Sequence, residues 1–480
     1  MKNVIIGAGP AGRLAGLEFG RLGEEALLIE KNDLGGTCLN EGCMVVCALN
    51  DIAKFLNAKK QYERLGLLKG NIDISYEEIV NKIKKTQEII HEINHKENTA
   101  HNNEIIYGEA KLGENELTVN GETWQWENLL IATGGRPFIP NIPGKEYGLT
   151  NQDLLKIKEV PEKLNIIGGG IIAAEISNIF SSLGSKVNII ARSGFLKELD
   201  VEIREYVIEK LFKNVKVYEN MDLLEIKKKK IIAEDKNKQE FENKNKKKFE
   251  NKNKKEFKDK NKKELKNKTE EFKDSEIKEF EGKTFIATGR VPNSEIARTI
   301  LKDDDFDKKG AIKVNEMMQT SKKNVYAAGD VTGGITLTPV ARMEGILASR
   351  NMAGYSNKIE YKAIPQTIAL DMNVSFAKNN DLKNNDFENN SQKTEDIILP
   401  GSAGPGGWWR VLTGDTGITK SSFNTENDLL ESITAVSPSS VSDIAYLSYL
   451  MRIGENIENF DEFIEIHPST DVFFQIMKYI

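Results

Sequence analysis

Residues 3–12 read NVIIGAGPAG, an apolar run followed by glycines at the spacing G-x-G-x-x-G. Residues 164–173, LNIIGGGIIA, repeat the arrangement. In both places a helical pattern and a second apolar run follow, the latter at 26–30 and 186–191. Strands that alternate with helices in this way predict parallel sheets, which bind ligands at the carboxyl ends of their strands.

Each glycine-rich turn has the context of a dinucleotide-binding site, because glycine lets the backbone approach a pyrophosphate at a helix N-terminus. Glu30 lies 23 residues after Gly7, where a carboxylate could accept both hydroxyls of an adenosine ribose. The equivalent position of the second turn is Ala191, followed by Arg192 and, a little later, Lys197. Cations without a carboxylate favour NADPH over NADH at the second site. The alternative is that Arg192 is solvated and the site is indifferent.

The composition indicates a polar globular chain of about three domains at ~150 residues each. Its 480 residues are 39% hydrophobic, and 67 basic against 73 acidic residues give a net charge of -6. This balance argues against a dedicated nucleic-acid binder. No run of 18 apolar residues predicts a membrane span. The chain enters its first strand without a charged-then-apolar leader, so we expect no signal peptide and a cytoplasmic protein.

Residues 227–280 differ from the rest, because Lys, Asn and Glu dominate them and an eight-residue unit recurs. Phe241, Phe249, Phe257 and Leu265 open successive units. One apolar residue in eight does not offset the entropy of ordering such a segment. We interpret it as a surface insertion, either disordered or an over-long hairpin; contact with nucleic acid or an acidic partner is the less favoured alternative.

All three cysteines lie in GGTCLNEGCMVVC, residues 35–47. Four residues separate Cys38 from Cys43, which places the sulfurs about one helical turn apart and close enough to bridge if the turn opens slightly. A zinc site would need further ligands, which do not follow at suitable spacing. Inert core thiols are the remaining alternative. The clustering favours chemistry at Cys38 and Cys43.

Together, GAGPAG, GGTCLNEGC, IATGGRP, GGGIIAAE, ATGRVPN, AAGD and IHPS resemble the pyridine nucleotide–disulfide oxidoreductase family, in particular its dihydrolipoamide dehydrogenase, glutathione reductase and mercuric reductase types. The resemblance implies an α/β fold with two Rossmann-like nucleotide-binding domains and a C-terminal α+β dimerisation domain. The predicted parts are an FAD-binding domain in 1–150 and 286–354, an NAD(P)-binding domain in 151–285 with the insertion 227–280, and a dimerisation domain in 355–480.

The family mechanism then implies a role for each thiol. NAD(P)H would pass hydride to FAD, and electrons would reach the flavin-proximal Cys43 and then Cys38, which attacks the substrate disulfide. His467 matches the family's His-Pro position and would act as the base on the partner subunit's Cys38 in a homodimer. Five residues later the family has a glutamate that orients the ring; here Val472 stands there, and Asp471 or Glu465 could substitute.

Cys47 stands where the family has a lysine paired with a glutamate, while Glu175 retains the glutamate. Without its cation the carboxylate of Glu175 should rise in pKa or turn toward water. For Cys47 we favour a small buried residue over a third redox sulfur.

The resemblance also implies a set of cofactor contacts. The aspartate of AAGD would bind the ribityl chain of FAD, and the helix after Pro339 would point its positive end at the flavin ring. The predicted cofactor-binding residues are Gly7, Gly9, Pro10, Ala11, Gly12, Glu30, Lys31, Gly36, Thr37, Thr133, Gly134, Gly168, Gly170, Ile171, Ile172, Arg192, Lys197, Gly289, Arg290, Gly329, Asp330 and Thr338.

We therefore predict an FAD-dependent NAD(P)H:disulfide oxidoreductase of the dihydrolipoamide dehydrogenase type, acting on a small-molecule or small-protein disulfide. Ile171, where glutathione reductases have a gating tyrosine, favours the lipoamide branch. Two other functions stay open: a flavin-dependent reductase or oxidase that uses a quinone, dye or oxygen, and a flavoprotein that serves as a non-catalytic binding component. Trp408 and Trp409 could line a substrate cleft or pack the dimer.

Overall fold

The computed structural model describes residues 2–236, 276–379, 394–462, 464 and 472. Its contacts form two compact units. The first consists of Met1–Phe138, Asn151–Glu159 and Arg290–Ile480, and the second of Ile139–Thr150 and Val160–Gly289. Among the described residues, no helix combines the length and the apolar composition that a membrane span requires.

The first unit contains a five-stranded parallel sheet, which confirms the first βαβ prediction. Its strand order is β18-β7-β1-β2-β3. Its strands are almost entirely apolar, as expected for a parallel sheet that is covered on both faces. The bounds are β1 Asn3–Ile6, β2 Ala26–Glu30, β3 Asn103–Tyr107, β7 Asn128–Ile131 and β18 Val325–Ala327.

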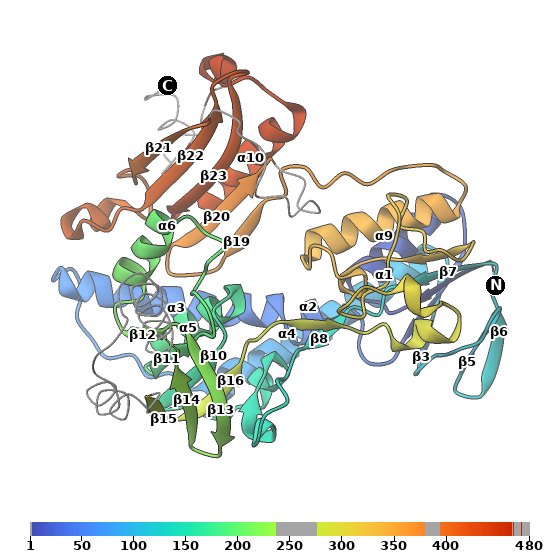
Figure 1. Ribbon diagram of the computed structural model, residues 1–480, viewed down its shortest axis with the longest axis horizontal. Coiled ribbons are helices and arrows are strands. Elements are labelled where there is room, and N and C mark those ends of the chain that lie inside the picture. Colours follow the sequence, from blue (N-terminus) through green and yellow to red (C-terminus); the bar gives the residue numbers. More distant parts are fainter. Residues whose placement is uncertain (1, 237–275, 380–393, 463, 465–471, 473–480) are drawn as a thin grey trace, which may run out of the picture. The chain divides into compact units, whose positions relative to one another are not determined.

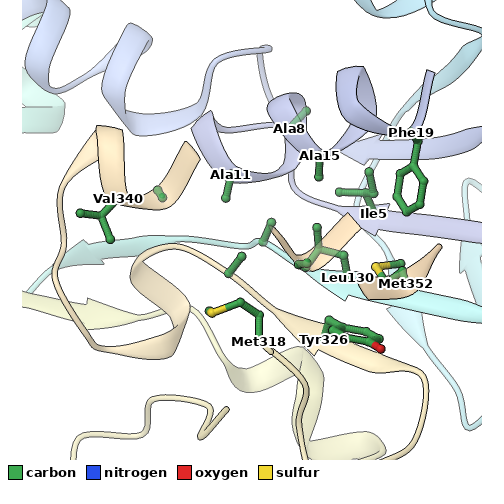
Figure 2. Close-up of a cluster of buried hydrophobic side chains, with 14 of the residues drawn as sticks. Ile5, Ala8, Ala11, Ala15, Phe19, Leu130, Met318, Tyr326, Val340 and Met352 are labelled. Atoms are coloured by element: carbon green, nitrogen blue, oxygen red, sulfur yellow. The ribbon is translucent and has the colours of Figure 1, made fainter. Parts of the chain in front are cut away.

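Two helices that are far apart in the sequence pack against each other on this sheet. Figure 1 shows α1 (Pro10–Arg21) beside α9 (Thr338–Met352). The helices touch at Gly345, where an added Cβ would lie 2.1 Å from the carbonyl oxygen of Ala11. Figure 2 shows the small side chains Ala11 and Ala15 of α1 in the same buried cluster as Val340 and Met352 of α9. Small residues at this crossing bring the two helix N-termini close to the same end of the sheet.

The segment with the cysteines forms two helices, α2 (Gly36–Asn40) and α3 (Cys43–Arg64). The predicted amphipathic helix at about 76–95 is α4 (Tyr76–Ala100), which begins with a side-chain cap from Ser75 to the backbone N–H of Glu78. Small β elements complete this part: β4 Lys111–Leu112, β5 Glu116–Val119 and β6 Glu122–Gln125 form one sheet, and β8 Gly135–Pro137 pairs with β17 Arg290–Pro292.

The second unit repeats the parallel architecture, as the second glycine-rich turn predicts. Its strand order is β12-β11-β10-β16-β9, with α5 (Ile171–Ser182) after β10 and α6 (Val201–Tyr206) after β11. The bounds are β9 Gly148–Leu149, β10 Lys163–Ile167, β11 Lys186–Ile190, β12 Val215–Tyr218 and β16 Lys283–Ile286.

An antiparallel sheet in the second unit contains both ends of the predicted insertion. It consists of β13 (Met221–Lys227), β14 (Lys230–Asp235) and β15 (Ile277–Glu281). The unusual composition begins at Lys227, the last residue of β13, and ends at Phe280 in β15, so both of its ends belong to one antiparallel sheet. Residues 237–275, which hold the phenylalanine repeat, lie outside the described residues, so the choice between disorder and a long hairpin stays a prediction.

The C-terminal part of the first unit is an antiparallel sheet with the order β19-β20-β23-β22-β21, and Figure 1 shows α10 (Ser440–Ile453) beside it. Ile444, Leu447 and Leu450 of α10 pack with Ile433 and Ala435 of the sheet. The bounds are β19 Gln366–Ile368, β20 Asn373–Lys378, β21 Thr394–Pro400, β22 Ile418–Asn424 and β23 Leu429–Ser437. A five-stranded sheet with a helix is the α+β composition predicted for this region.

Candidate functional site

Cys38 and Cys43 lie at the start of two successive helices. Cys38 is the third residue of α2, and Cys43 is the first residue of α3. Gly42, which precedes α3, offers no side-chain cap, so the first N–H groups of this helix face Cys43 without a competing side-chain acceptor. Both cysteines are free thiols, with Cys38 half-buried and Cys43 exposed.

The two thiols differ in acidity: the pKa of Cys43 is lowered and that of Cys38 is raised. A hydrogen bond from the Cys38 thiol is the main cause that lowers the pKa of Cys43 to about 6, and contacts with Thr338 and the backbone act in the same direction. Burial and the charge of Asp330 oppose this shift. Conversely, the pKa of Cys38 is raised, first by that same hydrogen bond and then by burial. Cys43 is therefore the thiolate of the pair near neutral pH, and Cys38 keeps its proton.

A residue nearly 300 positions away completes this pair: the Oγ1 of Thr338 lies 3.6 Å from the Sγ of Cys43. Thr338 is the first residue of α9, whose N-cap Leu337 gives no side-chain cap. Thus two helix N-termini, those of α3 and α9, converge on one sulfur. Their partial positive charge stabilises a thiolate there.

Cys47 corrects one of our predictions. It lies four residues after Cys43 on α3 and is exposed, whereas we favoured a small buried residue. The inward positions of this helix are Val45, Leu49 and Asn50, so the helical period turns Cys47 outward. Glu175 lies on α5 of the second unit, and its predicted relation to Cys47 stays a prediction. Among the described residues, no group of three His, Cys, Asp or Glu side chains could hold a metal ion.

The backbone around the first glycine-rich turn packs so closely that a side chain would not fit at two glycine positions. Gly7 has φ +97°, and an added Cβ would lie 2.4 Å from the carbonyl oxygen of Ala132. Gly36, at the start of α2, approaches Gly9 so closely that its Cβ would lie 2.8 Å from the Cα of Gly9. Since Gly9 gives α1 no side-chain cap, the first N–H groups of α1 point into a space lined by backbone alone. This is the cradle that a pyrophosphate needs.

Two buried carboxylates organise the backbone around the turn. Glu30, at the end of β2, accepts hydrogen bonds from the N–H groups of Ala8 (2.8 Å) and Asn32 (2.9 Å). Glu344 of α9 is 1% exposed and accepts from the N–H of Gly329 (2.7 Å) and the hydroxyl of Tyr361 (2.5 Å). We did not predict Glu344 or Tyr361, because neither stands in a motif that we singled out.

Asp330 follows Gly329, and its carboxylate accepts a hydrogen bond from Nε of Arg290 (3.0 Å). Arg290 also donates to the carbonyl of Gly135. An added Cβ on Gly329 would lie 3.4 Å from the Cβ of Ala11, so this strand end lies against the start of α1. Thr133 donates to the carbonyl of Asn293 (2.6 Å), and the backbone carbonyl of Gly134 accepts from the N–H of Asn293.

The second glycine-rich turn contacts the loop that carries the predicted cations. The N–H of Leu196 donates to the carbonyl of Gly169 (2.6 Å), and Glu219 accepts from the N–H of Phe195 (2.6 Å). The first bond holds the loop between β11 and α6 against the turn that precedes α5, and the second joins it to the residue that follows β12. Arg192 and Lys197 are both exposed on this loop.

The remaining predicted residues lie at the ends of the expected elements. Pro10 and Gly12 open α1, Lys31 is exposed after β2, and Thr37 is the second residue of α2. In the second unit, Gly168 has φ +131°, Gly170 precedes Ile171 and Ile172 at the start of α5, and Gly289 has φ +118°. His467 and Asp471 lie outside the described residues, so their roles stay predictions.

Comparison with known proteins shows the family of the chain. Residues 1–345 match the model of the pyridine nucleotide-disulphide oxidoreductase family. The dihydrolipoyl dehydrogenase of Bacillus subtilis is 30% identical over 77% of this chain and 75% of its own length. That of Buchnera aphidicola subsp. Schizaphis graminum is 27% identical over 97% of this chain and 92% of its own. The fold is similar to that of the HOCl-induced flavoprotein disulfide reductase RclA from Escherichia coli, with a TM-score of 0.79, 20% identity and full coverage of both chains.

The chain belongs to the pyridine nucleotide–disulfide oxidoreductase family. It is an oxidoreductase that uses FAD and NAD(P) and acts on sulfur groups, and the predicted fold class, cofactors and enzyme class are confirmed. The residues present fit FAD, because the glycine cradle, the uncapped start of α1 and Glu30 lie together in the first unit. FAD would supply the coupling between a hydride donor and a dithiol.

Replacing Thr338 by valine should raise the pKa of Cys43, because it removes a hydroxyl beside the thiolate. We expect a rise of roughly half to one pH unit, the size of one hydrogen bond worth about 1 kcal/mol. The measurement is the pH dependence of Cys43 alkylation by iodoacetamide in the reduced protein, read by mass spectrometry. Thr338→Ser keeps a hydroxyl and should titrate like the wild type; identical profiles for the valine and serine variants would contradict the role of this contact.

Proposed function

We propose that this chain is an NADPH-dependent disulfide reductase in which Cys38 attacks the substrate and Cys43 resolves the intermediate. The observation that carries the proposal is the position of Cys43, which lies at the start of α3, five residues after Cys38 and 3.6 Å from the hydroxyl of Thr338. Only the more acidic sulfur is a stable thiolate at rest, which suits the sulfur on the flavin side. The raised pKa of Cys38 then requires a base when substrate arrives.

The proposed reaction transfers two electrons from NADPH to the substrate disulfide. The deprotonated Cys38 attacks one sulfur of the substrate, which breaks the substrate S–S bond, forms a mixed disulfide between Cys38 and the substrate, and releases one thiolate. The Cys43 thiolate then attacks the Cys38 sulfur, which releases the second thiolate of the substrate and leaves a Cys38–Cys43 disulfide. Two protons convert the released thiolates into thiols, and NADPH reduces the Cys38–Cys43 disulfide back to the dithiol. We propose that the partner subunit's His467 accepts the Cys38 proton and returns it to a leaving thiolate, with Asp471 orienting its ring.

Substitution of Cys38 by serine tests this order. Because a serine hydroxyl is not ionised near neutral pH, disulfide-dependent NADPH oxidation should fall by roughly three orders of magnitude or more, while reduction of a dye such as ferricyanide persists. Steady-state rates with a panel of lipoamide, oxidised glutathione and a small protein disulfide give the measurement.

Cys47→Ser is the matched control and should keep disulfide reduction, since Cys47 takes no part in the proposed exchange. Disulfide reduction that survives Cys38→Ser would defeat the proposal. A wild-type enzyme that reduces dyes, quinones or oxygen but no disulfide would favour the alternative of a non-disulfide acceptor. No NADPH consumption with any acceptor would favour a binding component.

The preference for NADPH rests on the loop beside the second glycine-rich turn. Arg192 directly follows the buried Ala191 at the end of β11, where a carboxylate would exclude a 2′-phosphate. The bond from Leu196 to Gly169 keeps that loop against the turn, so Arg192 and Lys197 stay at the nucleotide-binding end of the sheet.

Arg192→Ala should therefore raise the KM for NADPH about tenfold, as expected for loss of one charge-assisted contact, and change the KM for NADH less than about twofold. Initial rates with each nucleotide at a saturating acceptor give the comparison. Lys186→Ala is the control, because Lys186 begins β11 at the opposite end of the strand. Equal effects on both nucleotides would refute the preference.

We propose that the C-terminal part forms a homodimer. Helix α10 buries one face in the sheet, yet Tyr446, Tyr449 and Ile453, spaced three and four residues apart, are exposed on another. The nearby sequence 408–413 also exposes Trp408 (63%) and Leu412 (69%). Apolar surface of this extent indicates a protein partner, and a second copy fits the proposed use of His467.

The three cysteines lie within ten residues and form no disulfide, which fits a reducing compartment. We therefore propose that the protein is cytoplasmic.

Sedimentation velocity tests the dimer. The wild type should sediment as a dimer, and the double substitution Tyr449→Glu, Ile453→Glu should yield monomers, because two buried carboxylates would face the partner unpaired. Val201→Glu introduces the same charge at an exposed apolar residue of α6 and should leave the dimer intact. A wild type that sediments as a monomer at micromolar concentration would exclude this assembly.

A further inference from the structure

We propose that Arg342 determines substrate specificity by binding an anionic group, such as a carboxylate, next to the disulfide of the substrate. This inference rests on the proposed function, because it assigns the chemical class of disulfide that reaches Cys38. No motif in the sequence singled out Arg342, although it lies on the helix after Pro339 that we predicted to face the flavin ring.

The helical period places Arg342 beside the thiols. It lies four residues after Thr338 on α9, so it occupies the same face of the helix about one turn, or ~6 Å, farther along. The Oγ1 of Thr338 is 3.6 Å from the Sγ of Cys43. The face of α9 that contacts the redox pair therefore continues directly into Arg342.

The charge of Arg342 affects groups on two other helices, Cys38 on α2 and Arg13 on α1. It favours the thiolate of Cys38, against the hydrogen bond and burial that raise the pKa of that thiol, and it also disfavours the charge of Arg13 on α1. These effects agree with the position of Arg342 on the face of α9 that carries Thr338, the face that contacts the redox pair. A substrate disulfide in contact with Cys38 must come near it.

The other arginines of this region already have carboxylate partners. Arg13 pairs with Glu97 at 2.8 Å, Arg350 with Glu18 at 2.7 Å and Arg290 with Asp330 at 3.0 Å. Arg342 is exposed, and within the described ranges of the chain no carboxylate forms an ion pair with it. Arg342, the arginine of α9 nearest to Thr338, is therefore available to bind an anion from solution.

The backbone under Arg342 is held in place, which makes the cation a defined feature of the site. The contact of Gly345 with the carbonyl of Ala11 sets the distance between α9 and α1. Glu344 ties α9 to Gly329 and Tyr361 through two buried hydrogen bonds. A guanidinium on a fixed helix can bind a carboxylate with two parallel hydrogen bonds.

Lipoate and lipoamide provide a matched pair of substrates, because they share the dithiolane ring and differ in a carboxylate against a neutral amide. For the holoenzyme with NADPH, we expect Arg342→Gln to lower the ratio of kcat/KM for lipoate to that for lipoamide about five- to tenfold. Arg342→Glu should lower it further and Arg342→Lys should keep most of it. Arg64→Gln is the control, since Arg64 is exposed at the last turn of α3, about 30 Å of helix away from Cys43.

A second measurement needs no turnover: alkylation of Cys38 by iodoacetate and by iodoacetamide, which differ in the same way, in a Cys43→Ser background that removes the more acidic thiol. Arg342→Gln should slow the anionic reagent several-fold relative to the neutral one. Unchanged ratios in both measurements would overturn the inference, as would equal losses for charged and neutral compounds, which would show an effect on the thiol alone. If the wild type reduces no disulfide of the panel, the proposed function fails, and the alkylation ratio still decides the role of Arg342.

Discussion

The hydrogen bond between the Cys38 and Cys43 thiols is the interaction on which the rest of the site depends. It assigns the negative charge to Cys43, at the start of α3, and leaves the proton on Cys38. Every other feature near the pair acts on this division: Thr338 and the helix N-terminus favour the thiolate, whereas Asp330 opposes it. A dithiol whose members were equally acidic would give no direction to the exchange.

This arrangement requires that three segments distant in the sequence meet at one end of a sheet. The first turn contacts the start of α2 through Gly9 and Gly36, and the start of α1 contacts the middle of α9 through Ala11 and Gly345. Backbone-to-backbone contacts of this kind tolerate no side chain. Glu30 and Glu344, both buried, stabilise the strand ends at the same place because each accepts two hydrogen bonds.

The two units show how one architecture serves two nucleotides. Both have a parallel sheet with a glycine-rich turn and an uncapped helix N-terminus, in α1 and α5. The first ends its second strand on the buried carboxylate of Glu30, and the second on Ala191 followed by exposed cations. The unusual segment 237–275 enters between paired strands β14 and β15, away from the turn in sequence, so the architecture accommodates it without a break in either sheet.

The amino-acid sequence alone determined the two parallel sheets, the two nucleotide-binding turns and the reactive cysteine pair, because these features are local: apolar runs, glycine spacing and neighbouring thiols. The family resemblance also named Thr338, as a cofactor contact. Only the tertiary structure decided that Cys47 is exposed, that Glu344 and Tyr361 stabilise the strand end, and that Arg342 is exposed with no carboxylate partner among the described residues. These are properties of burial and of contacts between α1, α2, α3 and α9, which no spacing along the chain records, since the packing of helices depends on side chains hundreds of residues apart.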